Sequence, residues 1–262
     1  MELNHKRPYA AILGASVCLA LAACLAGCPK QTDERKQERS LVVLCGSSFV
    51  PPMKELCAQF TRETGVEVVT TVAGSEDFLP LIKAGRKGDI LITHHPYQEY
   101  VRDAGALDCL AQVGFVAPVL AVQKGNPKGL ESINDLTRPG LRVALSNPEY
   151  STCGQMVFDL LEKKGIKAAV MKNVENRLTK GHANLGTLVK TGAVDAVIMW
   201  NGVANTFRDS LEVVPTPYEY GTEIGVYIVG LNYSESPDLV RKFVEFARSG
   251  GKDIFARHGY TK

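Results

Sequence analysis

The sequence has almost no excess of charge of either sign. Its 262 residues include 30 lysines and arginines against 28 aspartates and glutamates, which leaves a formal net charge of +2 at pH 7. This balance excludes a nucleic-acid-binding protein that depends on bulk positive charge. The chain also lacks a repeat of fixed period, any CxxC pair and any cysteine–histidine spacing typical of zinc sites. Repeat architectures and a structural zinc centre are therefore excluded as well.

The composition that remains is ordinary for a packed globular protein. Hydrophobic residues make up 45% of the chain and charged residues 22%, which is far from the composition of a disordered chain. The length suits one large domain or two domains of roughly 100 residues each.

The N-terminus predicts export and lipid anchoring. A basic patch precedes an apolar run over residues 9–26, and the run ends in Leu-Ala-Gly before Cys28. This ending resembles the bacterial lipobox, in which the cysteine becomes the acylated N-terminus. We therefore expect residues 1–27 to be a lipoprotein signal peptide, Cys28 to carry lipid, and residues 28–40 to form a polar tether. A plain transmembrane anchor is the alternative, and the length of the run, near the short limit for spanning a bilayer, weighs against it.

Four cysteines remain in the body of the chain, and their pairing stays open. They are Cys45, Cys57, Cys109 and Cys153. An even number of cysteines in an exported protein permits disulfide bonds, but three connectivities are possible and the sequence does not choose among them.

Strand and helix patterns alternate along the body of the chain. Short apolar runs at residues 41–45, 66–72 and 89–93 are separated by helical patterns. Their spacing of roughly 20 to 25 residues predicts right-handed βαβ units with helices on both faces of a sheet. A second series contains strand patterns at residues 142–145 and 194–199, with helical patterns at residues 153–164 and around Leu188 and Val189 between them. A strand at residues 224–231 and a helix at residues 237–249 close the chain.

Two segments marked by prolines connect the two series, namely residues 113–123 with Pro118 and residues 213–217 with Pro215 and Pro217. The sequence therefore predicts a two-lobed α/β fold, in which each lobe is a mixed, mostly parallel sheet flanked by helices and two crossing segments act as hinges. We assign residues 41–118 and 222–262 to lobe I and residues 119–221 to lobe II.

Small hydroxyl and glycine residues follow three of the predicted strands, at residues 46–48, 73–75 and 151–154. In open α/β sheets a ligand lies beyond the carboxyl ends of the strands, near helix N-termini. A helix start offers unpaired N–H groups and a partial positive charge, so several starts together create an anion site without lysine or arginine. Each junction alone is an ordinary helix cap. Their co-occurrence is what indicates a binding site.

The chain resembles the molybdate-binding proteins that feed ABC importers, a group within the periplasmic solute-binding proteins. The resemblance is carried by pieces in the same order over almost the whole chain after the tether: LVVLCGSSFVPPMKEL, ETGVEVVTTVAGSEDFLPLIKAG, GDILIT, SNPEYSTCG, LVKTGAVDAVIMW and FVEFARSGGKDIFARHGY.

This resemblance implies a type 2 periplasmic binding protein fold whose lobes close on a tetrahedral oxyanion held by neutral donors. By position, Ser48 and Ser75 match two hydroxyl ligands of the family, and Cys153 matches a backbone N–H donor. His182 falls near a position that normally gives only a backbone N–H, and Trp200 stands where the family has a tyrosine. The resemblance further implies no cofactor and no catalysis, a membrane permease as partner, and a monomer on the periplasmic or extracellular face of the membrane.

Three departures from the family bear on which ligand binds. The indole N–H of Trp200 can only donate, whereas a phenol can also accept. Glu76 and Asp77 stand where the family has small residues; they can stabilise a helix start, or a carboxylate facing the cleft can accept a protonated oxygen and favour phosphate over molybdate. His94 and His95 can contact a ligand or a metal, but adjacent residues in extended chain point in opposite directions.

We therefore interpret the chain as a lipid-anchored solute-binding protein that takes molybdate, with tungstate second. The same fold with sulfate, phosphate or a metal at His94 or His95 is the nearest alternative. An enzyme using Cys153, His182 and Asp195 and a ligand-sensing regulatory domain are further alternatives, and the export signal and the lack of a helix-turn-helix segment weigh against the latter. With neutral donors at the ligand, we expect Arg86, Lys87 and Lys180 to lie at the rim of the site and to affect the rate of capture.

Overall fold

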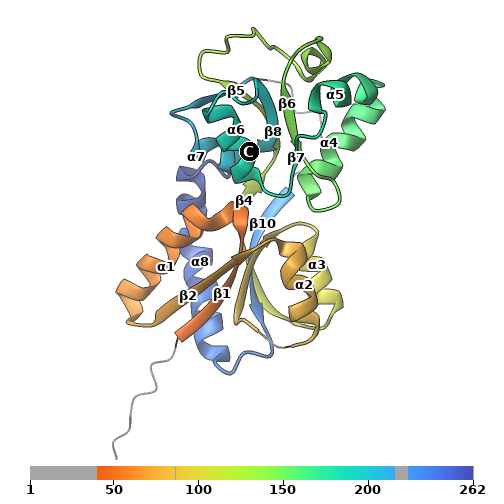
Figure 1. The fold of residues 1–262 in the computed structure, drawn as a ribbon. Coiled ribbons are helices and arrows are strands. Elements are labelled where there is room, and N and C mark those ends of the chain that lie inside the picture. Colours follow the sequence, from red (N-terminus) through yellow and green to blue (C-terminus); the bar gives the residue numbers. More distant parts are fainter. Residues whose placement is uncertain (1–39, 86, 216–223, 262) are drawn as a thin grey trace, which may run out of the picture. The chain divides into compact units, whose positions relative to one another are not determined.

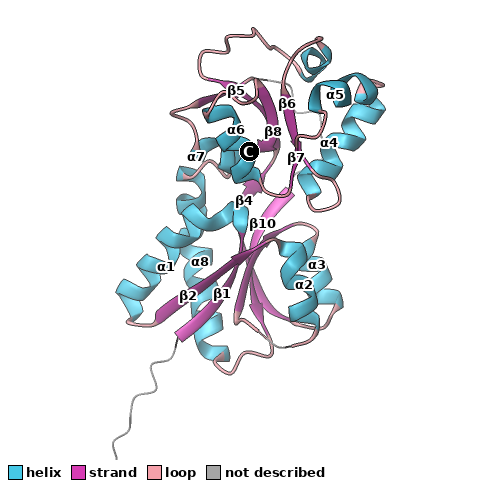
Figure 2. Cartoon of the chain, viewed as in Figure 1, coloured by secondary structure: helices cyan, strands magenta, loops and turns pink. Residues whose placement is uncertain are grey.

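The computed structural model describes residues 40–85, 87–215 and 224–261, which form two α/β units built on one sheet each (Figures 1 and 2). We call them lobe I and lobe II. The predicted signal peptide, the lipidation site Cys28 and almost all of the tether lie outside the described residues, as do Arg86 and Pro217. No helix within the described ranges has both the length and the apolar character needed to cross a membrane.

Lobe I is a five-stranded mixed sheet between two pairs of helices. The strands lie in the order β2-β1-β3-β10-β4; β1 pairs in parallel with β2 and β3, and β10 runs antiparallel to β3 and β4. The elements are β1 (Ser40–Gly46), the 3-10 turn η1 (Ser47–Phe49), α1 (Val50–Thr64), β2 (Glu67–Ala73), α2 (Ser75–Lys83), β3 (Ile90–His94), α3 (Tyr97–Asp103), β4 (Leu107–Val116), β10 (Ile224–Leu231) and α8 (Pro237–Arg257).

The apolar run of β1 is buried because helices cover both faces of this sheet. Alternate side chains of a strand point to opposite faces. Accordingly Val43 packs in the core with α1 and α8, while its neighbour Leu44 packs in a second core with Phe78 and Ile82 of α2. Figure 1 shows α1 and α8 together on one side of the sheet and α2 and α3 on the other.

Lobe II has the same plan. Its strands lie in the order β7-β6-β8-β5-β9; β6 is parallel to β7 and β8, and β5 is antiparallel to β8 and β9. The elements are β5 (Pro118–Gln123), the 3-10 turn η2 (Ile133–Thr137), β6 (Val143–Ser146), α4 (Thr152–Lys163), α5 (Lys167–Val174), β7 (Leu178–Thr179), α6 (His182–Lys190), β8 (Ala196–Trp200), α7 (Asn201–Thr206) and β9 (Leu211–Val213).

The predicted two-lobed α/β fold with mixed sheets is confirmed. In each described sheet two neighbouring pairs are parallel and two antiparallel, so the sheets contain more antiparallel pairing than the βαβ rhythm predicts. The reason is that β10 and β5 arrive from crossing connections and enter each sheet in the reverse direction.

The first crossing lies at Ala117, between the last residue of β4 in lobe I and Pro118 at the start of β5 in lobe II. The Ala117 N–H donates to the Asn201 side chain at 3.2 Å, and the Asn201 N–H donates back to the Ala117 carbonyl at 3.0 Å. A single residue therefore passes between the sheets, held on both of its backbone polar groups.

Candidate functional site

A small cavity lies where four helix starts meet, two from each lobe. Its volume is about 40 Å³. Lobe I contributes residues 46–49, which lead into α1, and residues 74–76 at the start of α2; lobe II contributes residues 150–152 before and in α4 and residues 180–182 at the start of α6. The side chains of His94, Tyr97 and Trp200 complete the lining.

This arrangement follows from strand direction. Residue 46 ends β1, Gly74 follows the end of β2, and Trp200 ends β8, so the lining gathers at the carboxyl ends of strands in both sheets. Each helix start directs N–H groups and the positive end of the helix dipole toward the same space. The geometry favours a small anion.

Gly154 brings α4 close enough to take part. A Cβ at this position would lie 2.6 Å from the carbonyl oxygen of Ser146, the last residue of β6. Only a residue without a side chain allows this approach between the helix and the strand end. Ser151 caps the same helix by accepting a hydrogen bond from the Gly154 N–H at 3.2 Å.

Ser48 and Ser75, the two predicted hydroxyl ligands, both line the cavity. The buried Ser75 hydroxyl lies 2.7 Å from the hydroxyl of Thr93 on β3, and either group can donate in that pair. The Ser48 carbonyl accepts a hydrogen bond from the hydroxyl of Tyr260, whose ring packs against Phe49. The structure thus brings the two serines together from separate helix starts.

His182 and Trp200 also line the cavity and are stacked on each other, with ring centroids 5.6 Å apart. His94 of lobe I meets the Trp200 ring edge-on at 5.4 Å. Burial lowers the pKa of His182 to about 3 and that of His94 to about 4. Both imidazoles are therefore neutral near pH 7.

A hydrogen bond assigns the tautomer of His94. The Nδ1–H of His94 donates to the His95 carbonyl at 2.7 Å, which leaves Nε2 with a lone pair only. The Nε2 of His182 lies 3.5 Å from the Ser151 hydroxyl, and either group can donate in that pair. The Nδ1 of His182 is a fully buried atom without a hydrogen-bond partner in the described residues. One ring nitrogen of a residue that lines the cavity is therefore left unpaired among the described residues.

Glu76 and Asp77 have different roles. An Asp77 oxygen accepts the Gly74 N–H at 3.2 Å, which caps α2, and both Asp77 oxygens lie 3.2 Å from the Nζ of Lys180 in lobe II. Glu76 instead lines the cavity, and burial raises its pKa above the ordinary value. Asp77 thus stabilises the helix start, whereas Glu76 faces the cleft.

The three basic residues expected at the rim differ in their positions. Lys180 lines the cavity with a half-exposed side chain that lies over the Tyr150 ring, so it is at the mouth. The expectation is wrong for Lys87, which precedes β3 and therefore lies at the opposite end of the sheet, where its carbonyl accepts a hydrogen bond from Tyr233. Arg86 is outside the described residues.

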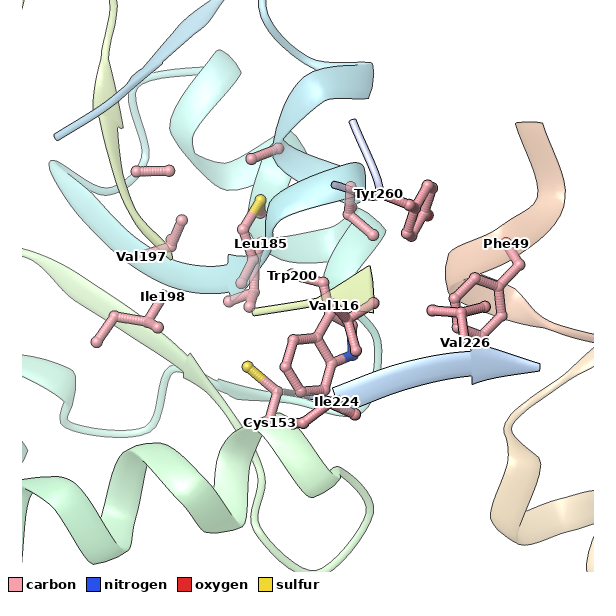
Figure 3. Packing of buried hydrophobic residues seen from close by; sticks show 14 of the residues in the cluster. Phe49, Val116, Cys153, Leu185, Val197, Ile198, Trp200, Ile224, Val226 and Tyr260 are labelled. Carbon is pink, nitrogen blue, oxygen red and sulfur yellow. The ribbon is translucent and has the colours of Figure 1, made fainter. Parts of the chain in front are cut away.

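The thiol of Cys153 is part of the core. Ser151 and Thr152 line the cavity at the start of α4, whereas the side chain of Cys153 is fully buried. Figure 3 shows its sulfur beside the indole of Trp200. Burial raises the pKa of this thiol, and a protonated buried thiol is a poor nucleophile.

Asp195 does not complete a catalytic triad either, because it is held by Arg142. One of its oxygens accepts the backbone N–H of Arg142 at 2.9 Å and the other accepts from the guanidinium at 2.6 Å.

No group of three or more potential ligands in the described part of the chain could hold a metal ion. His94 is buried and lines the cavity, whereas His95 is exposed and bonds to Gln98 at 3.0 Å.

The four described cysteines are free thiols, and their reactivities should differ. Cys45, Cys57 and Cys153 are buried and Cys109 is partly exposed. Burial also raises the pKa of Cys45 to about 12 and that of Cys57 to about 11. In pulse alkylation of the native full chain at pH 8, read by peptide mass spectrometry, we expect Cys109 to react at least tenfold faster than the other three, because it is the most exposed of the four described cysteines. All four should react fully in urea, and two that stayed unmodified there would indicate a disulfide.

Comparisons with known proteins agree with this geometry. The family model described as bacterial extracellular solute-binding protein matches residues 41–261. The molybdate-binding protein ModA of Mycobacterium bovis is 25% identical over 266 residues, which cover 96% of each chain. The sulfate-binding protein of Escherichia coli is 30% identical over 119 residues, which cover 38% of this chain and 36% of the relative.

Solved structures give the same fold. The periplasmic molybdate-binding protein of Azotobacter vinelandii superposes with a TM-score of 0.68 at 17% identity, over 85% of this chain and 99% of that one. The similarity spans both lobes, so it supports the assignment of the architecture as a whole.

Proposed function

We propose that this chain, which belongs to the bacterial extracellular solute-binding proteins, captures a tetrahedral oxyanion between its two lobes and delivers it to an ABC importer. The observation that carries the proposal is the convergence of four helix starts, two from each lobe, on one small cavity. Such a site holds an anion by neutral N–H and O–H groups. It performs no chemistry on its ligand.

Molybdate is the first candidate ligand, with tungstate second. The support is that the relatives matching 96% of this chain are named molybdate-binding, whereas the sulfate-binding relatives match 38% of it. Sulfate and phosphate are the competing oxyanions. Selection among dianions should follow the size of the cavity, because the donors come from rigid helix starts.

The proposed mechanism is hinge closure over the ligand. The cavity takes its donors from both lobes, and the Asp77–Lys180 pair joins the lobes at its mouth. An oxyanion stabilises the closed form because only there are both sets of donors engaged. The crossing at Ala117, held by Asn201, is a candidate hinge point.

Export and anchoring complete the proposal. The lipobox-like ending before Cys28 supports a lipid-anchored, monomeric protein on the periplasmic or extracellular face of the membrane. Mass spectrometry of the protein purified from membranes tests this: the expected N-terminus is an acylated Cys28, and an intact N-terminal segment would contradict it.

Calorimetric titration with molybdate, tungstate, sulfate and phosphate tests the ligand. We expect one-to-one binding of molybdate and tungstate with a dissociation constant of about 1 μM or below, equivalent to about 8 kcal/mol. Sulfate and phosphate should bind at least tenfold more weakly, which corresponds to a loss of about 1.4 kcal/mol. Failure of all four would remove the oxyanion assignment while leaving the fold intact.

Two hydroxyl variants serve as target and control in that titration. Ser75→Ala removes a hydroxyl that lines the cavity, and hydrogen bonds to charged groups contribute about 1.5–3 kcal/mol, so affinity should fall by at least tenfold. Thr187→Ala is the matched control, because the Thr187 hydroxyl bonds to the Ala183 carbonyl on the exposed side of α6. Equal losses in both variants would contradict the site.

A further inference from the structure

The wall that lobe I contributes to the cavity contains acceptors as well as donors. Glu76 is the second residue of α2, and its carboxylate folds back over the helix start: a Cβ placed on Gly74 would collide with it. The carboxylate therefore occupies space beside the N–H groups that would otherwise face an oxyanion. It is partly buried and lines the cavity.

His94 is the second acceptor in this wall. Its Nδ1–H is used by the His95 carbonyl, so Nε2 can only accept. Its ring is buried among Phe49, Tyr97 and Trp200, which leaves little freedom to turn. A fully ionised oxyanion has no hydrogen to give to either acceptor.

The charged and titratable groups around Glu76 do not neutralise it. Asp77 is the adjacent carboxylate, and it takes the ammonium of Lys180 at 3.2 Å. Tyr97, His94 and His182 complete the surroundings; both histidines are held neutral by burial. An ionised Glu76 and a dianion would thus face each other at contact distance in a small cavity, with Lys180 shared with Asp77.

We propose that the closed site holds one proton at the contact between Glu76 and the ligand. A dianion such as molybdate binds with uptake of one proton from solvent onto the Glu76 carboxylate, which then donates to a ligand oxygen. An oxyanion that already carries a hydroxyl, such as hydrogen phosphate, donates its own hydrogen to the ionised carboxylate and binds without uptake. This inference rests on the proposed function and makes Glu76 the residue that sets ligand choice with pH.

The proton belongs on Glu76 and not on the histidines. Protonation removes the charge of a carboxylate but creates one on an imidazole, and burial opposes the second change. In agreement, burial raises the pKa of Glu76 and lowers the pKa values of His94 and His182. Lys180 and Asp77 lie at the mouth as an exposed ion pair.

Proton uptake can be counted by calorimetry of the full chain in two buffers of different ionisation enthalpy at pH 8, with molybdate and inorganic phosphate as probes. We expect close to one proton per molybdate and close to none per phosphate. The dissociation constant for molybdate should rise toward tenfold per pH unit from pH 7 to pH 9, the slope for one coupled proton. No uptake with tight molybdate binding would overturn the proposal.

Two variants and a control locate the proton. Glu76→Gln should abolish the uptake, make molybdate binding independent of pH between pH 7 and pH 9, and strengthen it at least tenfold at pH 8. Gly74→Ala keeps the charge but displaces the carboxylate, and its uptake should fall as well. Asp77→Asn, which changes the neighbouring carboxylate, should keep an uptake of one proton. Uptake that persists in Glu76→Gln overturns the assignment to this residue.

The outcomes also separate this inference from the proposed function. If neither molybdate nor any other oxyanion binds the unmodified chain at any pH from 6 to 9, the proposed function fails. If an oxyanion binds tightly, with no proton uptake and no effect of Glu76→Gln on ligand ranking, only the inference about Glu76 fails.

Discussion

Acidification from pH 7.5 to pH 5 is expected to remove several kcal/mol from the unfolding free energy of the ligand-free protein, through His94 and His182. Their pKa values in the folded protein are about 4 and about 3, against an ordinary value of 6.5. Below pH 6.5 the unfolded chain therefore binds protons that the folded chain does not, so stability falls as the pH drops. The unfolding free energy changes by up to about 1.4 kcal/mol per pH unit for each histidine. Above about pH 7.5 the two histidines no longer make it depend on pH.

Urea unfolding at half-unit intervals between pH 5 and pH 7.5 measures this slope. The window is chosen to stay above the range of Asp195, Asp135 and Glu55, whose lowered pKa values make stability fall only in stronger acid. His94→Gln and His182→Gln should each remove about half of the slope, and the double variant should be nearly flat. A wild-type curve that is flat over this window would contradict the burial of the two rings.

The same two histidines connect stability to binding. They enclose Trp200 from different lobes, His94 on β3 and His182 at the start of α6. In the proposed hinge motion, opening of the lobes would separate these rings and admit water to them, which would remove the penalty for protonation. We therefore expect acid to favour the open form and to weaken ligand retention below pH 6.

The strands could be predicted from the sequence because a strand that is buried on both faces consists of a continuous run of apolar residues. Runs such as residues 41–45 and 224–231 are apolar on both faces, and helices cover both faces of these sheets. The observed β1 and β10 match those ranges within one residue. The split of residues 113–123 into β4 and β5 also follows from a local signal, Pro118.

Short helices were missed where tertiary contacts and not propensity stabilise them. The sequence of α7, NGVANT, is poor in helix formers. It is held by Asn201, which bonds to Ala117, and by Gly202, over which the ring of Tyr260 lies so closely that a Cβ would collide with it. Ala117 and Tyr260 lie far from α7 in the sequence, so no local sequence pattern predicts this helix.

The predicted ligand residues lie together to a large extent, because helix starts carry recognisable capping residues. Ser48, Ser75, His182 and Trp200 all line the cavity. For Cys153 only the backbone N–H is predicted to bind the ligand; its side chain lies in the core and Ser151 and Thr152 line the cavity at this helix start. The role of that N–H stays a prediction.

Tyr97 and Tyr150 were not predicted as lining residues. Tyr97 starts α3 directly after Pro96, and Tyr150 lies in the loop before α4. Neither position carries a capping pattern, and their approach to the cavity depends on how the two lobes close. Distances across a hinge are not encoded in any local window of sequence.

Replacing Trp200 with alanine should be the most damaging single substitution in the site. The side chain is 1% exposed and packs in the core with Cys153, Ile224 and Tyr260 (Figure 3). Truncation of a buried tryptophan costs about 3–5 kcal/mol of unfolding free energy. The change also removes the surface on which His182 stacks at 5.6 Å, so oxyanion affinity should fall by at least a hundredfold in calorimetry.

Two conservative variants separate the packing of Trp200 from its N–H. Trp200→Phe keeps an aromatic ring for His182 but has no polar hydrogen, whereas Trp200→Tyr restores a donor at the position where the resembling family has a phenol. If the indole N–H contacts the ligand, the Trp200→Tyr variant should bind the oxyanion at least tenfold more tightly than the Trp200→Phe variant. Both variants should lose comparable unfolding free energy relative to the unmodified chain. Equal affinities in the two variants would mean that Trp200 acts only by packing, and that the helix starts supply the donors. Wild-type affinity in Trp200→Ala would remove Trp200 from the ligand site altogether, although its ring lies against both His94 and His182.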